Sequence, residues 1–354
     1  MDTFPTLQAL EYGELHFAYD AASGLRAIIA LHSTRLGPAI GGCRVRAYAS
    51  EAEAIDDVTR LGQGMSYKAA HAGLPHGGGK SVILAPAELA KPGFDRARLF
   101  EAFGRFVHGL GGRYLTAEDS GTSPSDMNII RGVTPHVLGA SPEHGGGGDP
   151  SPFTALGCRR GIEAVAEHVL GKSGLAGLHV AIQGVGHVGY HLARELKSQG
   201  ARLTIADVDP ARAAMVVKEC GAAEAPIDHI LEVECDIVAP CALGGAITEA
   251  VAPTIRARAI AGAANNQLRT PGAGKILAER GIFYAPDYII NGGGLIHVAA
   301  EYAKQDREQS TARVLKVYDS IKGIIDRVRR DDVRPEVVAD QIAKEIIARG
   351  PAAA

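Results

Sequence analysis

The sequence predicts a two-domain α/β protein, and three observations lead to this prediction. The chain has 354 residues, more than the roughly 250 to 300 residues at which a single hydrophobic core stops growing. Its first third mixes short strands with helical patterns, whereas the chain after residue 152 alternates strands and helices, as in a parallel sheet covered by helices. Between these parts, residues 141–152 are too rich in glycine and proline for regular structure. We therefore expect an N-terminal mixed α/β domain and a Rossmann-type doubly wound parallel sheet, with the active site in the cleft between them.

The domain borders follow from the same patterns. Residues 1–146 should form the first domain and residues 147–325 the second. Residues 326–354 have a charged amphipathic pattern, so we expect a C-terminal helical segment that packs back on the first domain.

The composition describes an ordinary soluble globular protein and argues against several classes of function. Hydrophobic residues make up 46% of the chain and the formal net charge is -3, without a basic run, so no nucleic-acid partner is expected. No apolar stretch reaches the roughly 18 residues that span a bilayer, and the N-terminus lacks a signal-peptide pattern. The 5 cysteines form no Cys-x-x-Cys, and the histidines have no metal-ligand spacing. We therefore predict a cytoplasmic protein with reduced thiols, no metal and no membrane contact.

In the N-terminal domain, apolar alternation and turn residues indicate several elements. Residues 15–20 and 25–31 flank a turn of small residues, which predicts a β-hairpin. A helix should begin at Ser50, which has capping-box spacing to Glu53. The apolar stripe of this helix should contain Ile55, Val58, Leu61 and Met65. Further strands are expected over residues 81–85 and 112–117.

In the second domain, short apolar strands alternate with helical or loop segments. The expected strands are residues 179–183, 202–206, 236–239, 259–262 and 282–285. From Leu295 onward the pattern is mostly helical.

The turn after the first of these strands carries a glycine pattern. Gly184, Gly186 and Gly189 have the spacing Gly-x-Gly-x-x-Gly between an apolar strand and a helical run. In such a turn the first glycine permits the tight bend, the second lets the backbone approach a pyrophosphate, and the third allows close helix packing. Asp207 ends the next strand and would accept hydrogen bonds from a ribose 2′-hydroxyl while repelling a 2′-phosphate. The pattern therefore predicts an NAD site. The intervening loop residues assigned to this site are Val185, His187 and Val188.

Ligands of open parallel sheets bind beyond the carboxyl ends of the strands. Three further strand ends carry residues suited to such a place, and they are Cys241 with Ala242, Asn265 with Asn266, and Asn291. An asparagine pair offers neutral donors and acceptors to a nicotinamide amide or a substrate amine. Asparagine is also common in turns, so a purely conformational role of the pair stays open.

Two lysines and an aspartate indicate chemistry in the first domain. Lys80 follows three glycines, as in a phosphate-binding P-loop, but that motif requires a glycine where Leu74 stands. Lys68 continues the apolar stripe of the predicted helix, and lysine is rarely buried without a partner. Asp119 follows the strand expected over residues 112–117 and can point into the same cleft. A partly desolvated lysine near another cation has a lowered pKa and can act as a base, whereas a charged lysine can hold a carboxylate. This set predicts oxidation at a carbon next to a carboxylate.

Six segments of the chain carry a family resemblance: LGPAIGGCR, GMSYKAAHAGLPHGGGKSVI, TAEDSGT, VAIQGVGHVGYHL, IAGAANNQL and YAPDYIINGGGLIHVAAE. In order and spacing they are similar to the glutamate, leucine, phenylalanine and valine dehydrogenase family, most of all to its leucine dehydrogenase branch. The resemblance covers nearly the whole chain. It implies that an L-amino acid, NAD and water give a 2-oxo acid, ammonium and NADH in a reversible oxidative deamination. It also implies a homo-oligomer whose first domain binds the substrate.

The resemblance assigns roles to single residues. The lysine that matches Lys80 is the catalytic base that activates water, the one that matches Lys68 binds the substrate carboxylate, and the aspartate that matches Asp119 assists proton transfer. The residues that match positions lining the substrate are Gly41, Gly42, Asn265 and Asn266. The residues that match the side-chain pocket are Ile40, Ala117, Leu295 and Val298.

The apolar pocket residues predict a branched-chain aliphatic substrate: leucine, isoleucine or valine. A glutamate-specific member is expected to have lysine at the position of Ile40, so glutamate should be a poor substrate here. His297 resembles the phenylalanine dehydrogenases, which makes an aromatic amino acid the alternative.

Two hypotheses from different classes also stay open. The first is a non-catalytic NAD-binding relative, which should lack Lys80 or Asp119, and the second is a 2-hydroxy-acid dehydrogenase, which usually employs histidine with arginine.

Overall fold

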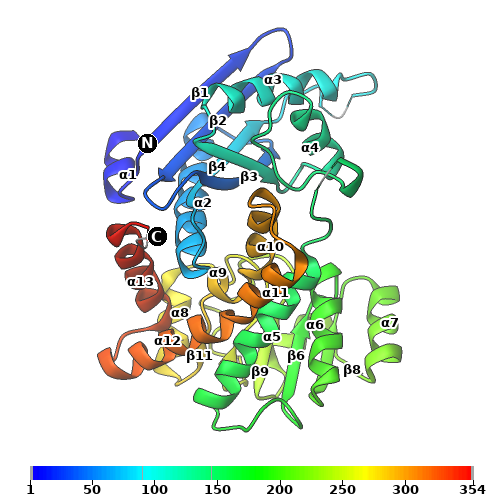
Figure 1. Cartoon of the computed structure of the whole chain (residues 1–354). Helices are drawn as coiled ribbons and strands as arrows, with labels where there is room; N and C mark the ends of the chain where they lie inside the picture. Colours follow the sequence, from blue (N-terminus) through cyan, green and yellow to red (C-terminus); the bar gives the residue numbers. More distant parts are fainter. Residues whose placement is uncertain (1–2, 90, 145, 352–354) are drawn as a thin grey trace. The chain divides into compact units, whose positions relative to one another are not determined.

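The computed structural model describes residues 3–89, 91–144 and 146–351, which form two compact units (Figure 1). The first unit contains the chain up to Gly148, together with Val298–Gln305 and the C-terminal residues from Ala343. The second unit contains Asp149–His297 and Asp306–Ile342. The expectation of domains over residues 1–146 and 147–325, with residues 326–354 as a helical segment that packs back on the first domain, stays a prediction.

The first unit is built on a five-stranded mixed sheet in the order β1-β2-β4-β3-β5. Its strands are β1 (Glu14–Asp20), β2 (Leu25–Ser33), β3 (Ala39–Arg46), β4 (Gly77–Leu84) and β5 (Tyr114–Glu118). β2 pairs antiparallel with β1 and β4, whereas β3 runs parallel to β4 and β5. The antiparallel pairing of β1 with β2 confirms the expected hairpin.

Helices cover both faces of this sheet. The helices of the first unit are α1 (Thr3–Ala9), α2 (Glu51–His71), α3 (Arg96–Gly109), α4 (Pro124–Arg131) and the 3₁₀ turn η1 (Pro142–His144). Alternate residues of β2 point to opposite faces, as strand geometry requires. Ile28 and Ala30 pack with Val58 of α2, whereas Ile29 packs in a separate core with Phe103 of α3.

The strand expected over residues 81–85 begins earlier than predicted, at Gly77, so β4 includes the three glycines before Lys80. A Cβ on Gly78 would lie 1.9 Å from the backbone nitrogen of Ser66, and a Cβ on Gly77 would lie 1.8 Å from the carbonyl oxygen of Ser33. Glycine is required because the backbones of α2 and β2 approach β4 too closely for a side chain. The close approach explains why a strand forms in a sequence that resembles a loop.

The same close packing changes which face of α2 is buried. The predicted start is confirmed, because the Ser50 side chain accepts a hydrogen bond from the backbone of Glu53. The predicted apolar stripe is only partly right, since Val58 is buried but its other members are half-buried. The fully buried face consists mostly of small residues, among them Ala54, Gly62, Ser66 and Ala69. Small side chains let the helix approach the glycine strand.

The second unit contains a six-stranded sheet in the order β11-β10-β9-β6-β7-β8, in which all pairings are parallel. The strands are β6 (His179–Gln183), β7 (Arg202–Ala206), β8 (Ala223–Glu224), β9 (Ile237–Pro240), β10 (Ala259–Ile260) and β11 (Phe283–Tyr284). Starting from β6, the chain builds the sheet outward in one direction and then in the other, as in the doubly wound Rossmann order. The predicted fold class is confirmed. β6 and β7 have the expected bounds, and the other three expected strands overlap β9, β10 and β11.

Helices complete the second unit and the C-terminal part of the chain. They are α5 (Ser151–His168), α6 (His187–Ser198), α7 (Pro210–Cys220), η2 (Ile227–Glu232), α8 (Pro271–Glu279), α9 (Asp287–Ile290), α10 (Gly293–Tyr302), α11 (Arg307–Leu315), α12 (Val317–Asp331) and α13 (Pro335–Arg349). The mostly helical pattern expected from Leu295 onward is confirmed. Within the three described ranges of the chain, no helix is both long and apolar enough to cross a membrane.

Candidate active site

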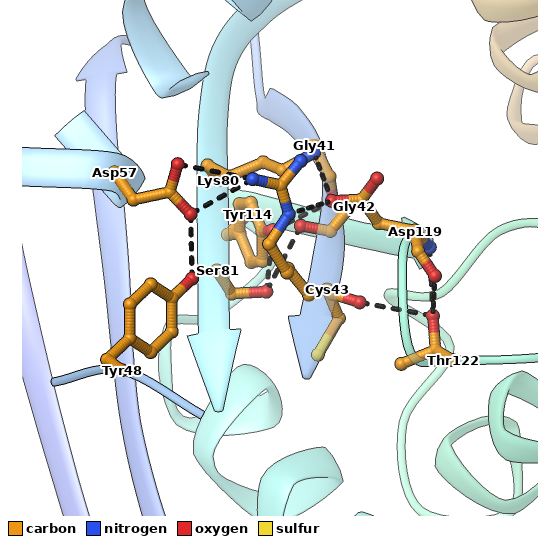
Figure 2. A network of polar contacts seen from close by, with 11 residues as sticks. Gly41, Gly42, Cys43, Tyr48, Asp57, Lys80, Ser81, Tyr114, Asp119 and Thr122 are labelled. Carbon is orange, nitrogen blue, oxygen red and sulfur yellow. Dashed lines mark hydrogen bonds and ion pairs between the residues drawn. The ribbon is translucent and has the colours of Figure 1, made fainter. Parts of the chain in front are cut away.

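The first unit brings Lys80 and Asp119 together. Lys80 lies in β4, and Asp119 directly follows β5. The Lys80 Nζ is 2.8 Å from Asp119 Oδ2, and the Lys80 side chain is only 8% exposed (Figure 2). A buried ammonium needs such a partner, because taking an unpaired charge out of water costs several kcal/mol. The aspartate therefore accounts for a lysine in the interior of this unit.

Gly42 provides the space for this pair. A Cβ at Gly42 in β3 would lie 2.8 Å from the Asp119 Cβ and 3.2 Å from the Lys80 Nζ. Any larger residue at this position would push the carboxylate and the amine apart. The neighbouring Gly41 is constrained by the backbone instead, since its Cβ would lie 1.8 Å from the carbonyl oxygen of Gly79.

Asp119 is held by its backbone as well as by its carboxylate. Its backbone N–H donates to Thr122 Oγ1 at 2.8 Å, and the Thr122 hydroxyl also lies 3.1 Å from the carbonyl oxygen of Cys43. Burial alone would raise the pKa of Asp119, but Lys80 and then Arg44 outweigh that effect and hold the pKa below its ordinary value. Asp119 is therefore a carboxylate at neutral pH.

A second group of polar residues adjoins the pair. Arg44 Nε donates to Asp119 Oδ2 at 3.2 Å, and its NH1 donates to both carboxylate oxygens of Asp57, at 2.9 and 3.2 Å. Asp57 Oδ2 also accepts a hydrogen bond from the Tyr48 hydroxyl at 2.7 Å (Figure 2). Sequence reasoning did not single out Arg44, Asp57 or Tyr48. Arg44 lies in the segment GGCR, two residues after the glycines assigned to the substrate. That position in the sequence could have indicated a role in the site.

Buried hydroxyl groups fix the strands beneath the pair. The Tyr114 hydroxyl lies 2.8 Å from the carbonyl oxygen of Gly41 and 3.1 Å from Ser81 Oγ, which itself donates to the carbonyl oxygen of Gly42 at 3.4 Å. Burial raises the pKa of Tyr114 far above its ordinary value, so it stays a neutral hydrogen-bonding phenol. These bonds tie β3, β4 and β5 together where Lys80 and Asp119 meet.

The other predicted residues of the first unit lie on the same sheet or on helices. Ile40 in β3 is buried and is paired in register with Gly78 and Leu115, while Gly42 is paired with Ala117 of β5. Lys68 is half-buried in the last turn of α2. Val298 is half-buried in α10.

In the second unit, the glycine turn between β6 and α6 has the geometry that a dinucleotide requires. Gly184 has φ +89°, and a Cβ on Gly189 would lie 2.0 Å from the carbonyl oxygen of Gly184. Gly186 is the N-cap of α6, and no side chain caps this helix end. The Gly186 Cβ position is open, with nothing nearer than 3.7 Å. Backbone N–H groups at a helix N-terminus bind phosphate, so these residues fit a dinucleotide cofactor.

Asp207 lies beside this turn. Its Oδ2 accepts a hydrogen bond from the Val185 N–H at 2.7 Å, and its Oδ1 accepts one from the Asp209 N–H at 2.8 Å. Each carboxylate oxygen has a second lone pair, so the acid can still accept a hydrogen bond from a ribose. His187 and Val188, which were assigned to the loop, are the first two residues of α6.

The structure also brings the other predicted strand ends of the second unit near one another. A Cβ on Gly184 would lie 2.8 Å from the Ala242 Cβ, and one on Gly189 would lie 3.4 Å from the Cys241 Cβ. Asn291 Nδ2 donates to Asn265 Oδ1 at 2.7 Å and lies 3.2 Å from the carbonyl oxygen of Ala263. This hydrogen bond orients the Asn265 amide.

Asn266 and Leu295 have different settings. Asn266 adopts a left-handed backbone with φ +50°, and its carbonyl oxygen accepts a hydrogen bond from the Gly245 N–H at 2.6 Å. Asparagine tolerates this conformation better than most residues, so the turn chemistry considered for the pair is present at Asn266. Leu295 is half-buried in α10.

His297, the residue behind the aromatic alternative, packs on a neighbouring ring. Its imidazole stacks on Phe153 with a centroid distance of 3.9 Å and an interplanar angle of 10°. The Arg307 guanidinium lies 5.6 Å from the centroid of the Phe153 ring. Packing on Phe153 is therefore a structural reason for His297 that does not involve the substrate. Among the residues that the structure describes, no three His, Cys, Asp or Glu side chains are grouped to hold a metal ion.

Comparisons with known proteins match both parts of the chain. Residues 12–136 match the model of the Glu/Leu/Phe/Val dehydrogenase dimerisation domain, and residues 204–334 match the Glutamate/Leucine/Phenylalanine/Valine dehydrogenase model. Leucine dehydrogenase of Geobacillus stearothermophilus is 47% identical over 98% of this chain and 94% of its own length. The chain belongs to the Glu/Leu/Phe/Val dehydrogenase family. It is an amino-acid dehydrogenase that carries out oxidative deamination with a nicotinamide cofactor.

Further members of this family are nearly as similar. Valine dehydrogenase of Streptomyces coelicolor is 47% identical over 93% of this chain and 90% of its own length. Among solved structures, L-tryptophan dehydrogenase from Nostoc punctiforme superposes with a TM-score of 0.87 and 37% identity, over 98% of both chains.

Proposed function

We propose that this dehydrogenase converts a branched-chain aliphatic L-amino acid, NAD and water into the 2-oxo acid, ammonium, NADH and a proton, in a reversible reaction. The observation that carries the proposal is the buried pair of Lys80 and Asp119, whose Nζ and Oδ2 atoms are 2.8 Å apart. A non-catalytic relative has no need for a buried amine and carboxylate at this place. The 2-hydroxy-acid alternative lacks support, because its usual acid-base histidine has no counterpart in this pair.

In the proposed reaction, Lys80 and Asp119 handle protons. A nicotinamide bound at the glycine turn would supply the acceptor for the hydride that leaves the substrate Cα. The Lys80 amine takes a proton from the water that adds to the resulting imine carbon, and returns a proton to the departing nitrogen. The Asp119 carboxylate accepts a proton from the substrate ammonium and exchanges it with Lys80 over their 2.8 Å contact. The pair passes one proton to solvent, which is the proton that the overall reaction releases, before Lys80 takes the proton of the added water. The Asp119 side chain is ionised at neutral pH, as a proton acceptor must be.

Lys68 is proposed as the anchor of the substrate carboxylate. It lies in the last turn of α2, and the buried face of this helix packs on β4, the strand that contains Lys80. A second lysine with a retained charge would orient the substrate by its carboxylate, and the backbone of Gly41 and Gly42 is proposed to line the substrate. Asn265 and Asn266 are proposed to lie near the substrate and the nicotinamide.

The proposed side-chain pocket is apolar. Ile40, Ala117, Leu295 and Val298 offer no charge to a distal carboxylate, so glutamate would bury an unpaired charge at a cost of several kcal/mol. The family members that match over more than nine-tenths of this chain include leucine and valine dehydrogenases, which supports an aliphatic substrate. The similarity to L-tryptophan dehydrogenase makes an aromatic substrate the competing outcome.

NAD is proposed in preference to NADP because Asp207 lies beside the glycine turn and would repel a 2′-phosphate. Gly184 to Gly189, together with Cys241, Ala242 and Asn291, would hold this cofactor. Its diphosphate would lie at the uncapped N-terminus of α6.

A homo-oligomer in the cytoplasm is the last part of this proposal. The edge strand β1 exposes Phe17 by 61% and Tyr19 by 76%, and unpaired edges with large apolar residues favour association. The matching family model for residues 12–136 is a dimerisation domain. The free cysteines suit a reducing compartment. Light scattering after gel filtration would reveal a monomer if this part is wrong.

A panel of L-amino acids with NAD, and of 2-oxo acids with ammonium and NADH, tests the function. Absorbance at the NADH band should change with leucine, isoleucine and valine and with their 2-oxo acids. Absence of turnover with every amino acid in the panel would contradict the proposal.

A further inference from the structure

Arg44 joins two carboxylates that lie on different elements. Its Nε is 3.2 Å from Asp119 Oδ2, and its NH1 is 2.9 Å from Asp57 Oδ2. Asp119 follows β5 and Asp57 lies in α2, whereas Arg44 itself lies in β3. The Arg44 side chain is only 19% exposed, so these contacts are partly shielded from water. A planar guanidinium can hold two carboxylates at fixed angles, which an ammonium cannot do.

Arg44 and Lys80 share one oxygen atom of Asp119. Lys80 Nζ lies 2.8 Å and Arg44 Nε 3.2 Å from the same Oδ2. Two donors from neighbouring strands therefore determine how the carboxylate is rotated. Without Arg44, the carboxylate could turn about its χ2 angle, which is soft for aspartate.

The far end of Arg44 is itself held. Asp57 accepts two hydrogen bonds from the Arg44 NH1 and a third from the Tyr48 hydroxyl, at 2.7 Å (Figure 2). Burial and then the Asp57 contact raise the pKa of Tyr48 well above its ordinary value, so Tyr48 remains a donor over the working pH range. The link from Asp57 to Asp119 therefore runs through the Arg44 guanidinium.

We propose that Arg44 is a positioning residue, which holds the Asp119 carboxylate against Lys80 and is itself held by Asp57 and Tyr48. The inference rests on the proposed function, in which Lys80 and Asp119 exchange protons. Arg44 acts in two separable ways: its charge favours the ionised form of Asp119, and its geometry fixes where that carboxylate points.

The charge effect has a defined sign. The charged groups that face Asp119 are Lys80 from β4 and Arg44 from β3, with Asp57 of α2 behind Arg44. Two nearby groups stay neutral, since burial raises the pKa of Tyr114 and raises that of Cys43 to about 12. Removing the Arg44 charge disfavours the Asp119 carboxylate, so the pKa of Asp119 rises. Activity on the acid side should then be lost at a higher pH than in the wild type.

The test compares kcat and KM across pH for four variants and a control. Arg44→Gln should lower kcat by roughly ten-fold to a hundred-fold through misplacement, and should move the acid limb of the kcat profile up by about one pH unit. Arg44→Lys should restore the acid limb but not the full kcat, because an ammonium cannot reach both carboxylates. KM for the amino acid should change much less than kcat in both variants.

Asp57→Asn separates position from charge. This variant keeps the Arg44 cation beside Asp119 but removes the ion pair behind it, so kcat should fall while the acid limb does not move up. Tyr48→Phe should give a smaller fall in the same direction. The matched control is Arg60→Gln, since Arg60 lies in α2, as Asp57 does, but is 70% exposed and pairs with Asp56 at 2.9 Å. Its kcat and pH profile should equal those of the wild type.

Thermal melting and NADH binding establish that each variant is folded. If Arg44→Gln does not fold, Arg44→Lys and Asp57→Asn decide the question, since both retain the charges nearest Asp119. A wild-type kcat and acid limb in the folded Arg44 variants would overturn the inference, as would an Asp57→Asn profile with the same upward shift as Arg44→Gln. Such an outcome overturns only the role of Arg44. The proposed function still stands if the wild type oxidises amino acids and Lys80→Arg does not. A wild type without amino-acid oxidation refutes the proposed function itself.

Discussion

The Lys80 amine is the single group whose replacement tests the proposed chemistry most directly. Lys80→Ala should lower turnover in both directions by roughly a hundred-fold to ten-thousand-fold, because the base is lost. Lys80→Arg is the matched control, since it keeps a cation beside Asp119 but a guanidinium does not give up its proton. Both variants should still bind NADH, as measured by fluorescence titration. More than about a tenth of the wild-type rate in either variant would show that Lys80 is not the base.

Asp126 allows a residue-level test that is independent of function. Its carboxylate accepts hydrogen bonds from Arg96, at 2.7 and 2.8 Å, and from the Ser123 N–H and hydroxyl, both at 2.8 Å. Burial raises the pKa of Asp126, but Arg96 and Ser123 outweigh it and lower the pKa below its ordinary value. A lowered pKa stabilises the fold above the unfolded-state pKa of about 3.9, and this stabilisation is lost as the pH falls towards the folded-state pKa.

Asp126→Asn should therefore destabilise the protein most at neutral pH. The loss of charge-assisted hydrogen bonds should lower the free energy of unfolding by about 1.5 to 3 kcal/mol. The difference in melting temperature between wild type and variant should narrow as the pH falls below about 4. A constant difference from pH 7 to pH 3 would contradict the assignment of Asp126 as a paired carboxylate.

At the level of elements, β4 and α2 depend on glycines that the packing requires. Gly78→Ala should be strongly destabilising or prevent folding, because its Cβ would lie 1.9 Å from the Ser66 nitrogen. Gly64→Ala in α2 is the matched control, since nothing lies within 4 Å of its Cβ position. This control should be neutral or stabilising by up to about 1 kcal/mol, the helix propensity difference between glycine and alanine. Melting temperatures of both variants check this pair, and equal values would refute the packing argument.

The element formed by β6, the glycine turn, α6 and β7 determines cofactor preference through Asp207. The wild type should use NAD with a much higher kcat/KM than NADP. Asp207→Ser should narrow this difference, since it removes both the ribose acceptor and the repulsion of a 2′-phosphate. It should also weaken the turn, because Asp207 accepts the Val185 and Asp209 N–H groups. Equal kcat/KM values for NAD and NADP in the wild type would show that Asp207 does not have this role.

For the whole molecule, the substrate preference is the property that depends on the complete pocket. One methylene group in an apolar pocket contributes only roughly 1 to 3 kcal/mol, so leucine, isoleucine and valine should all be substrates. The ratio of kcat/KM for leucine to that for phenylalanine should exceed one. A ratio below one would favour the aromatic alternative, and glutamate turnover of comparable efficiency would refute the apolar pocket.

The sequence by itself determined the features that depend on local spacing. The glycine turn was recognisable because its residues, the strand before it and the acid after it lie within one short stretch of chain. The strands over 179–183 and 202–206 and the helix start at Ser50 were predicted for the same reason. Lys80 and Asp119 were identified by residue type and by resemblance, although their contact could not be derived from spacing.

Only the tertiary structure decided which distant residues meet. Arg44 contacts Asp119 across 75 positions and Asp57 across 13, and no periodicity links these residues. The same is true of β4 and α2. The strand can include three glycines, and α2 can bury a face of small residues, only because the two backbones pack closely against each other. Local spacing specifies elements through short-range hydrogen bonds and propensities. Ion pairs and close backbone contacts depend on how the chain returns to itself, and that is a property of the folded structure.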